Sequence, residues 1–169
     1  GATTGTSDRL PMSPPRHQRF IWESLVARSP SEVYALGVFG DPPENFYPTA
    51  SYLARFDGAR WQRLDAPQGF WAPRAALTDD GSLWIVNDTF GANPSPPGTW
   101  TSMLLRRSPS GEWSQVRLRT PAGILGQDTL LSRLCVHEGA LWVMAFPEAQ
   151  RDRTLVWTTA QVDRPLLSL

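Results

Sequence analysis

The residues that could carry chemistry begin with one cysteine and two histidines. Cys135 and His137 are two positions apart, a spacing that places both side chains on the same side of a β-strand. A zinc site needs further ligands, and the only other histidine, His17, lies far away in the N-terminal segment. We therefore expect no metal site, and we interpret Cys135 as a small apolar residue that is buried in the core.

Catalytic motifs are also absent from the sequence. It contains no G-x-S-x-G, H-E-x-x-H or G-x-x-x-x-G-K-[ST] pattern, which hydrolases, zinc proteases and phosphate-binding loops use. Carboxylates in connecting segments could pair as acid and base, and these are Asp41, Glu44, Asp88, Asp128 and Glu148. Because charged surface residues are usually only solvated, we expect no catalytic residue and no cofactor.

The composition excludes several classes of protein. Sixteen basic residues balance sixteen acidic ones, whereas nucleic-acid binders and polybasic membrane binders depend on an excess of positive charge. A single cysteine cannot form an internal disulfide, and no apolar run approaches the length of a membrane-spanning helix. The 13 glycines, 16 prolines and 8 tryptophans instead favour many short strands joined by turns.

The first 19 residues differ from the rest of the chain. Residues 1–19 are rich in Thr, Gly, Ser and Pro and have almost no apolar periodicity. We interpret them as a flexible N-terminal arm or linker before a folded domain of residues 20–169. The opening residues resemble a linker exposed by processing, so a secreted, periplasmic or cell-surface location is slightly favoured over the cytoplasm.

The folded part contains an internal repeat. Three stretches align without gaps, at residues 26–36, 76–86 and 134–144. Each predicts a short strand, a tight polar turn and a second strand with one shared aromatic position, occupied by Tyr34, Trp84 and Trp142. We expect glycine to supply positive φ in two-residue turns, at Asp80-Gly81 and Glu138-Gly139, with Ser31-Glu32 in the first copy.

A second block extends each repeat. Residues 52–64 align with residues 104–116, and both contain a glycine turn followed by a strand that opens with Trp61 or Trp113. The third copy, residues 154–169, keeps the length but lacks this tryptophan. The repeats therefore cover residues 20–66, 70–119 and 124–169, with four strand-like segments in each.

Four-stranded repeats with glycine turns and periodic tryptophans resemble the blades of β-propellers. The sequence D-D-G-S-L-W-I at residues 79–85 is similar to the D-x-x-G-x-L-W-I repeat of bacterial sensor and surface propellers. The resemblance implies an all-β fold of three consecutive four-stranded antiparallel blades, with less than about 10% helix. It implies no particular activity, because propellers host unrelated functions.

Three blades do not close a ring, since propellers typically have four to eight. The first and last blades would each expose an apolar side that normally packs on a neighbour. We therefore expect a second copy, or another protein chain, to complete the ring. A homodimer with six blades is the simplest symmetric arrangement.

Connection lengths indicate where a partner could bind. The connections at residues 40–49, 65–73 and 87–100 are long and contain aromatic residues, including Phe70 and Trp71. We predict anchors and polar partners on this face, namely Phe46, Tyr47, Phe90 and Trp100 with Asp41, Glu44, Asp88 and Asn93. The repeat tryptophans should instead be packed inside the blades, and these are Trp61, Trp84, Trp113 and Trp142.

These features favour a non-catalytic interaction or structural module within an assembly. A carbohydrate-binding propeller is the alternative, because exposed aromatic rings can stack on sugar faces. A third interpretation is part of a propeller enzyme whose catalytic residues lie on missing blades. The identity of the ligand or partner is not encoded in any motif.

Overall fold

A computed structural model describes residues 19–40, 48–67, 70, 73–90, 100–117, 119–120, 123–124, 129–147, 154–159 and 167–168. These residues form an all-β protein with three antiparallel sheets, as predicted, and they contain no α-helix. Accordingly, this part of the chain has no helix that could cross a membrane. The sheets do not close into a ring.

Each sheet is a meander whose strands pair in chain order. The first sheet contains β1 (Arg19–Ser29), β2 (Glu32–Gly40), β3 (Pro48–Phe56) and β4 (Trp61–Leu64). The second sheet contains β5 (Arg74–Leu77), β6 (Leu83–Phe90), β7 (Trp100–Arg107) and β8 (Trp113–Val116). The third sheet contains β11 (Thr129–His137), β12 (Ala140–Pro147), β13 (Leu155–Thr158) and the two-residue β14 (Leu167–Ser168). A two-stranded ribbon, β9 (Arg119–Thr120) and β10 (Gly123–Ile124), lies between the second and third sheets in the chain.

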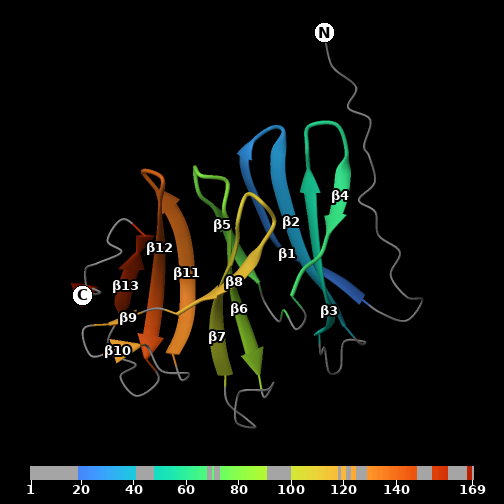
Figure 1. Ribbon diagram of the computed structural model, residues 1–169. Helices are drawn as coiled ribbons and strands as arrows, with labels where there is room; N and C mark the ends of the chain where they lie inside the picture. The colour runs from blue at the N-terminus through green and yellow to red at the C-terminus, as the bar shows by residue number, and fades with distance from the viewer. Residues whose placement is uncertain are drawn as a thin grey trace.

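The three sheets lie side by side in chain order, with the second between the other two (Figure 1). The short turns that join β1 to β2, β5 to β6 and β11 to β12 lie at one end of the molecule (Figure 1). The first strands of neighbouring sheets contact one another, β1 against β5 and β5 against β11. The sheets therefore pack against each other along one line of inner strands.

Two core layers, one on each side of the second sheet, join the three sheets, and a third cluster lies within the first sheet. Successive residues of β6 point to opposite faces, so Leu83 and Ile85 pack toward the first sheet while Trp84 and Val86 pack toward the third. The first layer also buries Tyr34, Leu36 and Val38 of β2, and the second buries Leu141, Val143 and Ala145 of β12. Both faces of the second sheet are therefore apolar, which explains its continuous hydrophobic strands.

The inner turns differ from the predicted pattern in length. Of the predicted turn pairs, Glu138 and Gly139 form a two-residue hairpin, with φ angles of 50° and 74°. Asp80 and Gly81 lie in a longer loop between Leu77 and Leu83. In the first sheet the turn residues are Pro30 and Ser31, not Ser31 and Glu32, because Glu32 already pairs with Ser29.

The short third turn changes the register of β11. The aromatic residue of β12, Trp142, pairs with Cys135, whereas its counterpart Trp84 pairs with Ala76. The gapless alignment had placed Leu134 opposite this position. Cys135 is exposed, so the prediction that it is buried was wrong. The physical reason is that a one-residue shift in a strand moves a side chain to the opposite face of the sheet.

A hydrogen-bond network holds the loop between β5 and β6. The Asp80 carboxylate accepts bonds from the Thr78 hydroxyl (2.6 Å) and from the Ser82 amide (2.9 Å) and hydroxyl (2.9 Å). Trp84 donates its indole N–H to the Thr78 hydroxyl at 3.2 Å, and the Arg106 guanidinium lies over the Trp84 ring. The loop therefore connects the buried tryptophan to the surface through satisfied polar groups.

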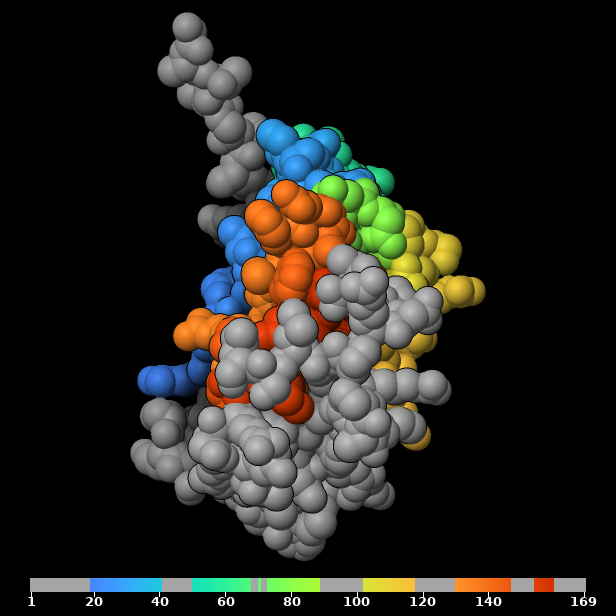
Figure 2. Space-filling view, turned by 90° about the vertical axis from the view of Figure 1, so that its left-hand side faces the viewer, coloured from blue at the N-terminus to red at the C-terminus, as the bar shows by residue number. Residues whose placement is uncertain are grey.

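The inner turns of all three sheets contact each other. Arg28, in β1, donates to the backbone carbonyl of Asp79 at 2.5 Å, and the Asp79 carboxylate lies against Gly139. Figure 2 shows the same arrangement as adjacent blue, green and orange segments at the top of the view. A Cβ at position 139 would lie 2.9 Å from the Asp79 carboxylate, which would have to move, and the positive φ of 74° independently favours glycine in this turn.

The repeat tryptophans are buried to different degrees. Trp84 is 6% exposed and belongs to the second core layer, as predicted. Trp61, Trp113 and Trp142 are only partly buried. Phe70, expected in a connection that binds a partner, is instead fully buried in the first core layer, where its amide donates to the Ser51 hydroxyl.

We predict that Trp84→Ala destabilises the protein by about 3–5 kcal/mol, because it removes a large buried ring and leaves a cavity. Trp61→Ala is the matched control and should cost only about 1 kcal/mol, since Trp61 lies at a half-exposed position. Urea denaturation followed by circular dichroism measures both values. Equal losses for the two variants would contradict the assigned positions.

A second prediction concerns Asp80. Burial alone raises its pKa, but hydrogen bonds from Thr78 and Ser82 and the charge of Arg106 lower it below the ordinary 3.8. The ionised carboxylate therefore contributes stability above this pH, and the contribution is lost as the pH falls through the folded-state pKa. Asp80→Asn should cost about 1 kcal/mol at pH 7, after allowance for solvent screening.

The stability difference between Asp80→Asn and the wild type should shrink in acid, where both side chains are uncharged. Urea unfolding at neutral and at acidic pH tests this dependence. Asp79→Asn, at the adjacent exposed position, is the control and should change stability little. A difference between Asp80→Asn and the wild type that stays constant with pH would contradict the role of the charge.

Candidate functional site

Polar side chains meet where the three sheets converge. Arg74, at the start of β5, donates to the Asp88 carboxylate of β6 at 2.7 Å and to the Leu131 carbonyl of β11 at 2.8 Å. The Ser102 hydroxyl of β7 donates to the other Asp88 oxygen at 2.6 Å. This polar junction, which consists of Arg74, Asp88, Ser102 and the Leu131 carbonyl, connects the second sheet to the third.

Asp88 is the one predicted polar partner whose side chain the structure describes. Its side chain is only 17% exposed, and both carboxylate oxygens accept hydrogen bonds from the protein. Both carboxylate oxygens are thus occupied by contacts within the protein. Asp88 thus has a structural role in the polar junction, on a strand and not in a loop.

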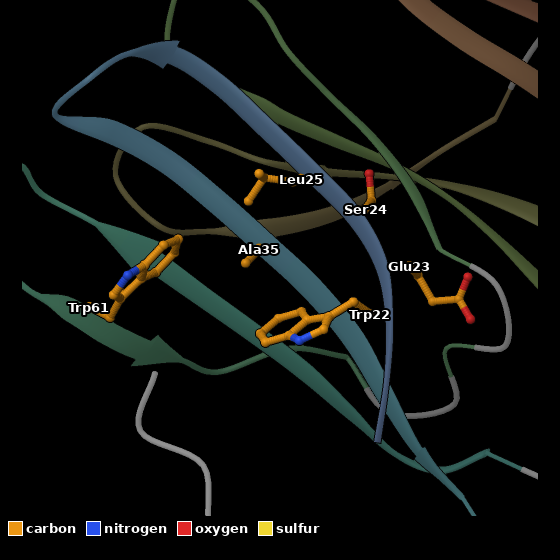
Figure 3. Close-up of a pocket in the computed structure, with 6 residues that line it drawn as sticks. All are labelled: Trp22, Glu23, Ser24, Leu25, Ala35 and Trp61. Carbon is orange, nitrogen blue, oxygen red and sulfur yellow. The ribbon is translucent and has the colours of Figure 1, made fainter. Parts of the chain in front are cut away.

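Glu23 lies beside the polar junction on β1. Partial burial raises the pKa of Glu23, and the positive charge of Arg74 opposes this effect. Glu23 also occupies a β-bulge, because Trp22 pairs with Gly37 while Ser24 pairs with Leu36. The bulge directs the carboxylate toward the second sheet and away from the aromatic residues of β1 (Figure 3).

The structure describes only a few of the remaining predicted site residues. Asp41, Glu44, Phe46, Tyr47 and Asn93 lie outside the described residues. Phe90 and Trp100 were expected in a loop, but their backbones pair with each other at the ends of β6 and β7. The strands continue to these two residues, so the connection between them is shorter than the sequence indicated. Trp71 also lies outside the described residues.

An apolar groove that sequence reasoning missed lies on the first sheet, on the face turned away from the second. Its volume is about 380 Å³, and it is lined by Trp22, Glu23, Ser24 and Leu25 of β1, by Ala35 of β2 and by Trp61 of β4. Figure 3 shows the two indole rings on the same side of the sheet, with Ala35 between them. Trp22 is 44% exposed and Leu25 is 69% exposed.

Aromatic rings make one wall of this groove rigid. The Phe20 ring meets the Trp22 and Tyr52 rings edge-on, at centroid distances of 4.5 and 5.4 Å, and meets the Phe39 ring at 4.8 Å. Gly37 leaves room for Phe20, since an added Cβ would lie 2.3 Å from its ring. We call this surface the open face of the first sheet, and it comprises Phe20, Trp22, Leu25, Ala35, Phe39, Tyr52 and Trp61. Trp22 and Leu25 are its exposed residues, whereas Ala35, Phe39 and Tyr52 are buried beneath the surface.

The open face was missed because of the bulge at Glu23. Strict alternation along β1 would place Trp22 and Leu25 on opposite faces, since they are three residues apart. The extra residue of the bulge puts both on the same face, opposite Gly37 and Ala35. The sequence signal that could have identified this face is the density of large apolar residues at positions 20–25.

The described residues contain no group of three or more His, Cys, Asp or Glu side chains that could hold a metal ion. His137 and Cys135 are both exposed on β11. No protein-family model matches the chain, and the search of curated proteins finds no match either. The polar junction and the open face of the first sheet are therefore the two candidate functional features of the described residues.

We predict that the ion pair of the polar junction stabilises the fold. Arg74→Ala should cost about 1.5–3 kcal/mol, because it leaves the mostly buried Asp88 carboxylate without its charged partner. Arg60→Ala is the control, since Arg60 pairs with Asp57 at the surface and should contribute nothing measurable. Thermal unfolding compares the variants, and a double variant Arg74→Ala/Asp88→Asn should recover part of the loss.

Proposed function

We propose that the chain is part of a β-propeller and acts as a non-catalytic interaction module. In this proposal its three sheets are blades, and a second copy or another protein chain completes the ring. A binding partner contacts the end with the long connections, where Phe46, Tyr47, Phe90 and Trp100 are the proposed anchors. The four-stranded meanders and their face-to-face packing support this assignment.

The observation that carries the proposal is the open face of the first sheet. Both faces of the second sheet are covered by its neighbours, through two separate core layers. The third hydrophobic cluster, in contrast, contains residues of the first sheet alone. Its exposed edge includes Trp22 and Leu25, and an apolar surface of this kind usually marks an interaction site.

The absence of a catalytic constellation in the described residues supports a binding role. Of the carboxylates considered, Asp88 is bound in the polar junction, and Glu23 has no second carboxylate bonded to it. Arg74 and Asp88 lie near the end that carries the long connections, where they can order the strands from which those connections start.

We predict that the purified chain associates, either with itself or with a partner from its native source. Trp22→Ala should weaken this association about thirtyfold, the effect of losing an interface anchor worth about 2 kcal/mol. Light scattering and co-purification measure the association, and circular dichroism checks the fold. Arg117→Ala, at an exposed position after β8, is the control. A soluble monomer that captures no partner would contradict the proposal.

Carbohydrate binding is a second candidate, favoured by the groove between Trp22 and Trp61. Indole rings can stack on the apolar faces of sugars, and two of them, the exposed Trp22 and the partly buried Trp61, line the groove. A glycan array distinguishes this function from protein association. Sugar binding that Trp61→Ala abolishes would support it, whereas an array without signal would leave protein association as the function.

A further inference from the structure

The internal repeat assigns two distinct faces to every sheet. We call the face turned toward the next sheet in the chain the leading face, and the face turned toward the preceding sheet the trailing face. The leading face of the first sheet packs on the trailing face of the second, and the second packs on the third in the same way. The open face of the first sheet is a trailing face, and the third sheet ends with a leading face.

Equivalent residues on the trailing faces follow from the strand register. β1 and β11 share a register shift at the same place, after Trp22 in the first sheet and after Leu131 in the third, and β1 has a second shift after Ala27. Leu25 then corresponds to Leu134. Leu25 pairs with the residue that follows Tyr34, and Leu134 pairs with the residue that follows Trp142. In the third sheet these residues are covered by the second sheet, with Leu131 only 5% exposed.

The leading face of the third sheet can be described in the same way. Trp142 corresponds to Trp84, and Cys135 corresponds to Ala76, because each pair shares the same register. Trp84 and Ala76 are both 6% exposed beneath the third sheet, whereas Cys135 is exposed. At the two ends of the chain these positions are therefore less covered, since Cys135 is exposed, Leu25 is 69% exposed and Trp142 is partly buried.

We infer that the leading face of the third sheet packs on the open face of the first sheet of a second copy, and reciprocally. This inference rests on the proposed function and deepens it, because it names the partner and both mating surfaces. Two copies then form a closed ring of six sheets, within the range of four to eight that propellers use. Among the described residues, no other four-stranded sheet packs on the leading face of the third sheet or on the trailing face of the first, so a pair of copies leaves neither face unused.

The side chains of the two surfaces are complementary in size. At the position where the second sheet carries Ile85, the first sheet carries Ala35, which forms the base of the groove. The groove between Trp22 and Trp61 can therefore receive the Trp142 ring of a second copy. A large residue thus meets a small one across the interface, which is how packed layers interdigitate.

The polar contact proposed between two copies repeats the one between the second and third sheets of a single chain. Arg74 on the leading face of the second sheet donates to the carbonyl of Leu131, the residue before the bulge of β11. Arg133 has the same register position on the third sheet, opposite Met144, and is exposed. It can reach the carbonyl of Trp22 in the second copy, next to the Glu23 carboxylate, which supplies the complementary charge.

Disulfide cross-linking tests this geometry with a cysteine that the chain already contains. Leu25→Cys is placed in a Cys135→Ser background, so that the variant carries a single thiol on the open face. It is mixed with differently tagged wild-type protein, whose single thiol is Cys135 on the leading face. Because Leu134 and Ala76, the internal counterparts, lie in one core layer, we expect a mixed disulfide dimer under mild oxidation.

Control variants make the result specific to the two faces. Glu112→Cys in the same background carries an exposed thiol on the turn before β8 and should cross-link at least tenfold more slowly. Leu25→Glu should convert the dimer seen by light scattering into monomers, with at least about thirtyfold weaker association and an unchanged circular dichroism spectrum. Position 25 is 69% exposed, so neither substitution at it should prevent folding of the monomer.

The possible outcomes separate this inference from the proposed function. A disulfide formed only between two Leu25→Cys chains would overturn the head-to-tail geometry. A monomer whose Leu25→Cys thiol becomes protected by a different chain, or by a glycan, would overturn the second copy as partner. The protein could also be a monomer whose thiol at position 25 reacts freely and which captures no partner from the native source. This outcome would contradict both the proposed function and the inference.

Discussion

The second sheet of this protein is apolar on both faces, and the packing of the three sheets follows from that constraint. A four-stranded sheet of this kind cannot keep either face in water without a large loss of hydrophobic free energy. The second sheet satisfies the requirement completely, because one core layer covers each of its faces. The order of sheets along the chain, the contact between first strands and the surfaces left over at both ends are consequences of this packing.

Polar groups are arranged so that they do not interrupt the packing. The Asp80 network stabilises a loop at the end of the core, where Trp84 needs a hydrogen-bond acceptor for its buried indole N–H. The polar junction has the same structural role at a second place, where the Arg74 guanidinium of β5 donates to a backbone carbonyl of β11. Both networks link neighbouring sheets or cap a hydrophobic layer. The role of both networks is therefore structural, which is compatible with the proposed interaction module.

The open face of the first sheet connects the fold to the proposed function. Inside the chain, a trailing face always meets the leading face of another sheet, and only the end sheets have unmatched faces. The aromatic wall formed by Phe20, Trp22 and Tyr52 is held by edge-to-face contacts before any partner arrives. A preformed apolar surface loses little conformational entropy on binding, which favours association.

Local patterns in the chain were sufficient to predict the strands, their grouping in fours and the burial of Trp84. Alternation of side chains and glycine at tight turns act over a few neighbouring residues, so they can be read without a structure. Exposure of Cys135, the shared face of Trp22 and Leu25 and the pairing of Asp88 could not be predicted in this way. A single residue added in a bulge or removed from a turn moves every later side chain to the other face. Which face is then covered depends on neighbouring sheets that are distant in sequence, and only three-dimensional packing specifies them.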